Sequence, residues 1–85
     1  MRTFEYTIKD ELGIHARPAG MLAKTAKSLG SEVTITKGEK TVVCTKLMAV
    51  MGLGVKCGDT VTFTVNGGDE EAAEAAMKEF LNANL

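Results

Sequence analysis

The sequence predicts an α+β fold in which helices cover one face of a single antiparallel sheet and the other face is open to water. Stretches in which apolar and polar residues alternate, as in half-buried strands, are interleaved with stretches of helical periodicity. Three of the alternating stretches carry threonine opposite their apolar residues, which is typical of a sheet with one wet face. The resulting order is β-α-β-β-α-β-α, with four strands in the sheet.

The N-terminal third of the chain predicts one strand and one helix. Residues 2–8 alternate between apolar and polar side chains, which indicates a half-buried strand. Residues 16–29 place their apolar side chains within one arc of a helix, and Gly30 follows as a typical helix stop. The residues of this arc are Ala19, Leu22, Ala23, Ala26 and Leu29.

The middle of the chain predicts a hairpin and a short helix. Residues 32–36 alternate and residues 40–44 return as a second strand, and a turn at residues 37–39 joins the two strands as a hairpin. Residues 46–54 are mostly apolar, too few for a long helix and closed by glycines, so we expect a helix of two turns. A loop follows at residues 55–59.

The C-terminal part predicts one strand and one helix. Residues 60–65 form the cleanest alternation in the chain, and residues 66–68, with two glycines, end it. The last helix opens at Asp69 with acidic residues in its first turn, as the helix dipole favours. We expect Glu74 and Lys78 to form an exposed i,i+4 pair. The predicted buried stripe is Ala73, Ala76, Met77 and Phe80.

Length and composition limit the class of protein. We expect the 85 residues, 1–85, to form one small domain. A formal net charge of -1 provides no general attraction to nucleic acid or to a membrane surface. No stretch resembles a signal peptide or a membrane span, so we expect a cytoplasmic protein without membrane insertion. Cys44 and Cys57 match no disulfide or metal spacing, and we expect free thiols that act as small buried hydrophobes.

The run GIHARPAG, which begins at Gly13, holds the only histidine and the only proline of the chain. Pro18 falls in the first helical turn, where its missing N–H removes no hydrogen bond, and Gly13 allows a sharp turn before it. His15 therefore stands ahead of a helix N-terminus, where free N–H groups and the helix dipole attract anions. The dipole also disfavours imidazolium, which leaves a neutral, nucleophilic ring. This combination predicts phosphoryl transfer to histidine.

Two neighbours of His15 complete the predicted site. We expect the backbone N–H groups of Ala16 and Arg17 to hold phosphate oxygens, and the Arg17 guanidinium to add a charge-assisted contact. A lone histidine is more often structural or merely exposed, but His15 lies outside the apolar positions of any periodic element. We expect no metal and no cofactor, because one histidine and two distant cysteines cannot supply three or four zinc ligands.

The short predicted helix has apolar side chains on two sides. Val50 and Leu53 share one side, whereas the other side carries Leu47, Met48 and Met51. A two-turn helix on a sheet cannot bury both sides, so a methionine-rich patch would remain exposed, which usually marks a partner surface. A helix wrapped more deeply into the core fits the same pattern equally well.

The segments 13–19 and 47–54 resemble the two motifs of the histidine-containing phosphocarrier (HPr) family of the bacterial sugar phosphotransferase system. The resemblance covers the whole chain and implies an open-faced β-sandwich. It implies that His15 accepts a phosphoryl group at Nδ1 from enzyme I, which phosphoenolpyruvate has phosphorylated. The group then passes to sugar-specific enzyme IIA domains during sugar uptake. The resemblance thus implies a phosphocarrier and not a stand-alone enzyme, and we expect a monomer.

The resemblance also implies where partners dock and which residue assists His15. Arg17 would lie beside the phosphohistidine. Partners would dock over the first helix and the short second helix. The residues implied at this surface are Gly20, Met21, Lys24, Lys27, Leu47, Met48 and Met51.

One position departs from the family pattern. In many low-GC Gram-positive members, the residue before the Leu-Met pair is a serine that an ATP-dependent kinase phosphorylates. Here that residue is Lys46, and an amine offers no hydroxyl, so we expect this serine-kinase control to be absent. Thr45, the nearest hydroxyl, is either a displaced helix cap or a displaced phosphorylation target.

Two other functions compete with the phosphocarrier. A regulatory binding module of the same fold would not need His15, which is present. A small-molecule-binding α+β domain would need a concave pocket, and nothing in the sequence indicates one. The sequence leaves open which sugars are served, and whether the carrier is general or dedicated to one system.

Overall fold

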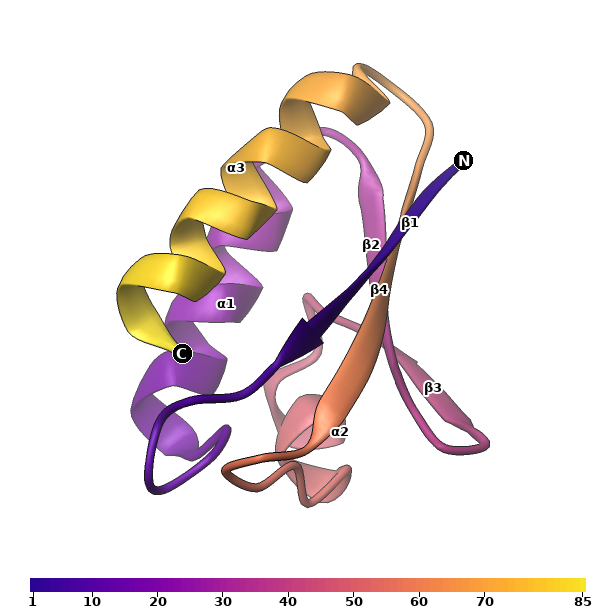
Figure 1. The fold of residues 1–85 in the computed structure, drawn as a ribbon. Helices are drawn as coiled ribbons and strands as arrows, with labels where there is room; N and C mark the ends of the chain where they lie inside the picture. The colour runs from indigo at the N-terminus through magenta and orange to yellow at the C-terminus, as the bar shows by residue number, and fades with distance from the viewer.

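The structure is a computed structural model that describes all 85 residues, and it has the predicted element order. The strands are β1 (Arg2–Thr7), β2 (Glu32–Lys37), β3 (Lys40–Val43) and β4 (Thr60–Asn66). The helices are α1 (Ala16–Ser28), α2 (Leu47–Gly52) and α3 (Glu70–Asn84). The strands form one antiparallel sheet in the order β1-β4-β2-β3, and the helices lie on one side of it (Figure 1). The predicted α+β fold is confirmed.

The central strand β4 shows how the alternation of side chains divides the sheet into two faces. Val61, Phe63 and Val65 are buried toward the helices. Phe63 lies between Phe4 of β1 and Ile35 of β2 in the register, and the two phenylalanine rings stack with centroids 5.4 Å apart. Such cross-strand pairs fix the register of a sheet.

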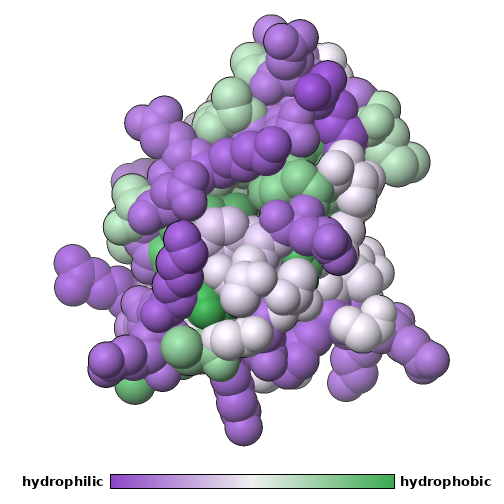
Figure 2. All heavy atoms as spheres, in the orientation of Figure 1, coloured by the Kyte–Doolittle hydropathy of each residue, from purple (hydrophilic) through white to green (hydrophobic).

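The opposite face of the sheet is lined with threonine, as the sequence predicts. Thr7 and Thr60 are joined across β1 and β4 by a hydrogen bond of 2.8 Å between their hydroxyls, and Thr36 and Thr41 are joined in the same way across β2 and β3. These hydroxyl pairs lie in exposed positions, so this face is open to water. In Figure 2, hydrophobic residues appear as small separate areas, with hydrophilic side chains between and around them.

The core lies between the sheet and the helices. From the predicted arc of α1, Ala19, Leu22 and Ala26 are buried, and the other two members are half-buried. In α3, Ala73 and Met77 are buried as predicted, whereas Ala76 and Phe80 are half-buried. Leu81, which the predicted stripe omitted, is also fully buried.

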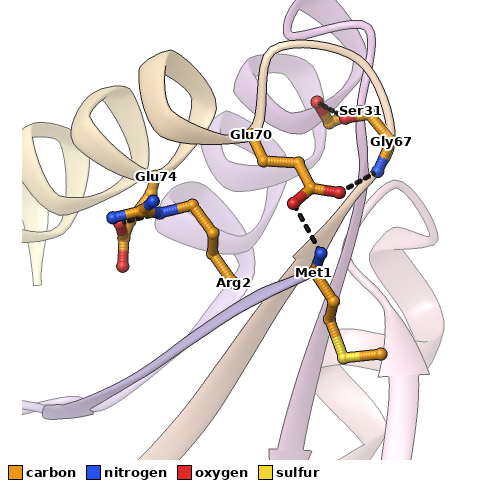
Figure 3. Close-up of polar contacts among 6 residues, drawn as sticks. All are labelled: Met1, Arg2, Ser31, Gly67, Glu70 and Glu74. Atoms are coloured by element: carbon orange, nitrogen blue, oxygen red, sulfur yellow. Dashed lines mark hydrogen bonds and ion pairs between the residues drawn. The ribbon is translucent and has the colours of Figure 1, made fainter.

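The prediction of an exposed Glu74–Lys78 pair is wrong in one respect. The two side chains do form an i,i+4 ion pair of 3.6 Å, but Glu74 is only 9% exposed. Its other carboxylate oxygen accepts a 2.6 Å hydrogen bond from Nε of Arg2, at the start of β1 (Figure 3). Burial removes water from the Glu74 carboxylate, which is unfavourable, and the contacts with two cations offset this loss.

The two cysteines differ. Both are free thiols, as predicted. Cys44 is buried, and burial raises the pKa of its thiol to about 12, so it acts as a small hydrophobe. The same prediction is wrong for Cys57, which lies exposed in the loop before β4.

No helix is long and apolar enough to cross a membrane.

Candidate functional site

His15 is the residue from which α1 starts, and its ring is left free. The backbone of His15 is extended, with φ −96° and ψ −174°, and its side chain makes no capping hydrogen bond. A capping side chain bonds the N–H of the second or third helical residue, and here the third is Pro18, which has no N–H. Of the two N–H groups that could bond the ring, those of residues 17 and 18, the proline therefore removes the second.

The turn before His15 is set by packing against a distant loop. Gly13 has φ +69°, a left-handed conformation that glycine adopts without strain. A side chain at this position would collide with the Val55 carbonyl oxygen and lie 2.6 Å from Cα of Lys56. The same carbonyl accepts the Ile14 N–H at 3.0 Å. The loop between α2 and β4 therefore forms the surface on which the His15 loop rests.

Two backbone donors beside His15 have no partner. The first backbone hydrogen bond of α1 runs from the Ala19 N–H to the His15 carbonyl oxygen at 2.9 Å, and the N–H groups of Ala16 and Arg17 donate to nothing. Such groups at a helix N-terminus carry the positive end of the helix dipole. The structure thus brings the two predicted phosphate-holding donors together with the imidazole ring.

His15 lies in an open hollow of about 280 Å³, and its side chain is 37% exposed. Arg17 lines the same hollow, which the sequence did not predict. Sequence reasoning missed the members from outside the motif, which arrive from the preceding loop and from the end of α3. The remaining lining residues are Asp10, Pro18, Met21, Ala83 and Asn84.

Asp10 is the charged residue of this hollow that sequence reasoning missed. Its Oδ1 atom lies 3.9 Å from Nε2 of His15, within ion-pair distance but too far for a hydrogen bond. The same Oδ1 accepts the Leu12 N–H at 2.9 Å, and the Gly13 N–H donates to the Asp10 carbonyl oxygen at 2.9 Å. An aspartate whose side chain accepts the N–H of the second residue after it is typical of a turn. The neighbouring sequence, however, does not show that this turn faces His15.

The predicted docking residues lie on α1 and α2, which pack against each other. We call this set the α1–α2 surface: Gly20, Met21, Lys24, Lys27, Leu47, Met48 and Met51. Met48 is 77% exposed, and Met21 and Leu47 are also exposed. Met51 is half-buried and packs against the core. An apolar group of this size at the surface is a frequent feature of partner interfaces.

The cations on the α1–α2 surface and next to it in sequence form no ion pair within the protein. Arg17, Lys24, Lys27 and Lys46 form no ion pair, whereas Arg2, Lys37 and Lys78 each hold a carboxylate. Apolar residues surrounded by free charges form the usual arrangement of a docking site. The exposed Lys46 is the residue from which α2 starts, so Thr45 is not the cap of this helix.

Comparison with known proteins identifies the family of this chain. A family model described as the PTS HPr component phosphorylation site matches residues 2–83. The chain is 39% identical to the phosphocarrier protein HPr of Mycoplasma genitalium over 85 residues, which cover 99% of this chain and 97% of that protein.

Solved structures match equally well. The histidine-containing phosphocarrier protein of Mycoplasma superposes with a TM-score of 0.91 at 35% identity, covering 96% of this chain and 93% of that one. An HPr of Thermoanaerobacter tengcongensis also gives a TM-score of 0.91, at 34% identity and with 98% and 93% covered. The protein therefore belongs to the HPr family, the phosphocarriers of the phosphotransferase system.

Proposed function

We propose that His15 is the residue that carries the phosphoryl group. The observation that carries the proposal is an imidazole ring that makes no capping hydrogen bond at the start of α1. The ring lies beside the unpaired N–H groups of Ala16 and Arg17. Phosphate oxygens on the ring would accept hydrogen bonds from these two donors. The Arg17 side chain, which lines the same hollow, would offset the charge of the group in transit.

The proposed partners are enzyme I as the donor and enzyme IIA domains as acceptors, in sugar uptake from phosphoenolpyruvate. We propose that both dock on the α1–α2 surface, one after the other, because His15 and Met21 border the same hollow. The proposed carrier is a monomer in the cytoplasm, and it meets its two partners in turn through this one surface. Positive charge around an apolar centre favours partners with acidic rims and speeds their association.

The acceptor is tested with purified enzyme I and phosphoenolpyruvate. The wild type should gain one phosphate that acid removes and base does not, as expected of a phosphoramidate. His15→Ala should gain none while keeping its melting temperature, because the ring makes no capping bond. Label that persists in His15→Ala would show that another residue is the acceptor.

The docking surface is tested with Met48→Asp. The charge should weaken binding of enzyme I about tenfold or more, the effect of losing a central interface contact. The melting temperature should change little, because Met48 is largely exposed. Ala75→Asp introduces the same charge on the exposed outer side of α3 and should leave binding unchanged. Equal binding by both variants would place docking elsewhere.

Regulation by a serine kinase is proposed to be absent. Lys46 is exposed at the start of α2 and has no hydroxyl to phosphorylate. Treatment with ATP and the family's kinase should therefore add no phosphate to the wild type, as read by mass spectrometry. Lys46→Ser should create a site beside Met48, and its phosphate should oppose binding of enzyme I. Phosphate on Thr45 of the wild type would show that the regulated position has moved by one residue.

A further inference from the structure

We propose that Asp10 is a positioning residue that keeps the proton of neutral His15 on Nε2 and so leaves Nδ1 free to attack phosphorus. This inference rests on the proposed function, because it concerns how the acceptor ring is prepared. It assigns a role to a carboxylate that lies outside the two sequence motifs and faces the ring from the preceding loop.

The Asp10 carboxylate is held firmly in place. Its Oδ1 atom accepts the Leu12 N–H at 2.9 Å. The Asp10 N–H donates to the Leu85 carbonyl oxygen at 3.0 Å, and the Asp10 carbonyl oxygen accepts the Gly13 N–H at 2.9 Å. Three backbone contacts therefore fix both the main chain and the side chain. A charged group that is already fixed in position stabilises a neighbouring group without a further loss of conformational entropy.

The orientation of the His15 ring decides what this field does. Nε2 is the ring nitrogen that faces Asp10, at 3.9 Å from Oδ1. An N–H at Nε2 points its positive end toward the carboxylate and is attracted, whereas a lone pair there would be repelled. The partner of one ring nitrogen sets the state of the other. Because the ring makes no hydrogen bond within the protein, the nearby Asp10 carboxylate is the group that selects the tautomer.

The selected tautomer suits phosphoryl transfer. The Nδ1 lone pair forms the new N–P bond, while the bond between phosphorus and the phosphorylated donor protein breaks and its electron pair stays on the donor. The proton on Nε2 remains where it is, and the ring gains positive charge that the Asp10 carboxylate offsets. Transfer to the next acceptor reverses these steps, so no proton has to leave or enter.

The two charged groups of the hollow thus have separate tasks. Asp10 faces the ring, and Arg17 is available to the phosphate. The other lining residues (Pro18, Met21, Ala83 and Asn84) carry no charge. Glu11, the next residue after Asp10, is exposed and forms no hydrogen bond or ion pair, which makes it a matched control.

The tautomer is measured first, on unphosphorylated protein with ¹⁵N-labelled histidine, by long-range ¹H–¹⁵N NMR at a pH where the ring is neutral. The wild type should show Nε2–H as the dominant form. Asp10→Asn keeps an oxygen for the Leu12 N–H but loses the charge, and the preference for Nε2–H should fall several-fold. Glu11→Gln should match the wild type. Equal tautomer ratios in the wild type and Asp10→Asn would overturn the proposal.

The second measurement follows phosphorylation of the same variants by ³¹P NMR. The wild type should carry phosphate on Nδ1, and Asp10→Asn should accept it about tenfold more slowly. Slower transfer with an unchanged tautomer ratio would make Asp10 a loop residue only and would also overturn the proposal. Because the tautomer is read without phosphate, a wild type that accepts none would defeat the proposed function, whereas the tautomer ratios alone still support or overturn the role of Asp10.

Discussion

Helices α1 and α3 begin in opposite ways, at opposite ends of the molecule (Figure 1). The first turn of α3 has a side-chain cap and its own negative charge: Asp69 accepts the Ala72 N–H at 3.1 Å, and the acidic residues Glu70 and Glu71 follow. The first turn of α1 has no capping side chain and no acidic residue. A helix start with a capping side chain and its own carboxylates stabilises the fold, whereas one that has neither can bind an external anion.

The charges around the two helix starts differ in the same way. We call Met1, Arg2, Glu70 and Glu74 the N-terminal clamp, which ties β1 to α3 (Figure 3). Glu70 takes the Met1 amine at 2.6 Å and the Gly67 N–H at 2.7 Å on its two oxygens. Around His15, in contrast, Arg17 has no carboxylate partner. Charges that are paired within the fold are thus separated in space from the unpaired charge of Arg17 beside His15.

Gly13→Ala should have the largest effect, because packing and not capping holds the start of α1. The new side chain would collide with the Val55 carbonyl oxygen and be strained at φ +69°, so unfolding should become easier by about 3 kcal/mol. Gly38→Ala is the control: its φ is +62° but its surroundings are open, so it should cost about 1 kcal/mol. Equal losses in urea unfolding would show that the Val55 contact is unimportant.

Arg17→Ala should separate function from stability. Transfer from enzyme I should slow about 100-fold, the usual effect of losing one group that stabilises charge in transit, while the melting temperature stays unchanged. Arg2→Ala should do the reverse, because Arg2 holds Glu74 and lies at the other end. Transfer kinetics and thermal unfolding of both variants decide this. If both arginines affect the same property, the separation of the two ends is wrong.

Asp69→Ala should destabilise the fold by about 1 kcal/mol, the usual loss for a helix cap. It should leave phosphorylation of His15 unchanged, because the two helix starts are independent. The comparison variant is His15→Ala, whose stability should stay close to that of the wild type, since the His15 side chain makes no capping bond. Urea unfolding of the pair gives the difference, and a larger loss for His15→Ala would mean that the ring does hold α1.

Acid should weaken the N-terminal clamp. The hydrogen bond from Arg2 holds the pKa of Glu74 below its ordinary value near 4.5, and the Met1 amine does the same for the pKa of Glu70. A lowered pKa in the folded state means stability that is complete above pH 4.5 and lost as the pH falls through the folded values. Glu74→Gln should flatten the acid limb of the unfolding free energy measured against pH, whereas Glu79→Gln should leave its slope intact.

The elements and the motif around His15 were predictable because their signals are local. Gly13 and Pro18 lie within five residues of each other, and the alternation in β4 needs only its own seven residues. The burial of Glu74 was missed because its partner, Arg2, is 72 residues away. For the same reason, the helical pattern alone assigned a charged residue to the outside of α3.

The rest of the hollow depends on packing between distant segments. Asp10 reaches His15 because its N–H bonds the Leu85 carbonyl oxygen at the end of α3. Asn84 enters the hollow from that same end. Tertiary contacts of this kind leave no periodic trace in the sequence, so the sequence indicated the imidazole at a helix start but not the carboxylate that faces it.

The most direct test of the account is a residue-resolved ¹H–¹⁵N spectrum recorded before and after phosphorylation by enzyme I and phosphoenolpyruvate. The account predicts large shifts of the Ala16 and Arg17 amides, smaller shifts around the hollow, and none for Gly67 or Glu70 in the region of the clamp. Unshifted Ala16 and Arg17 amides, or shifts of equal size at both helix starts, would contradict it.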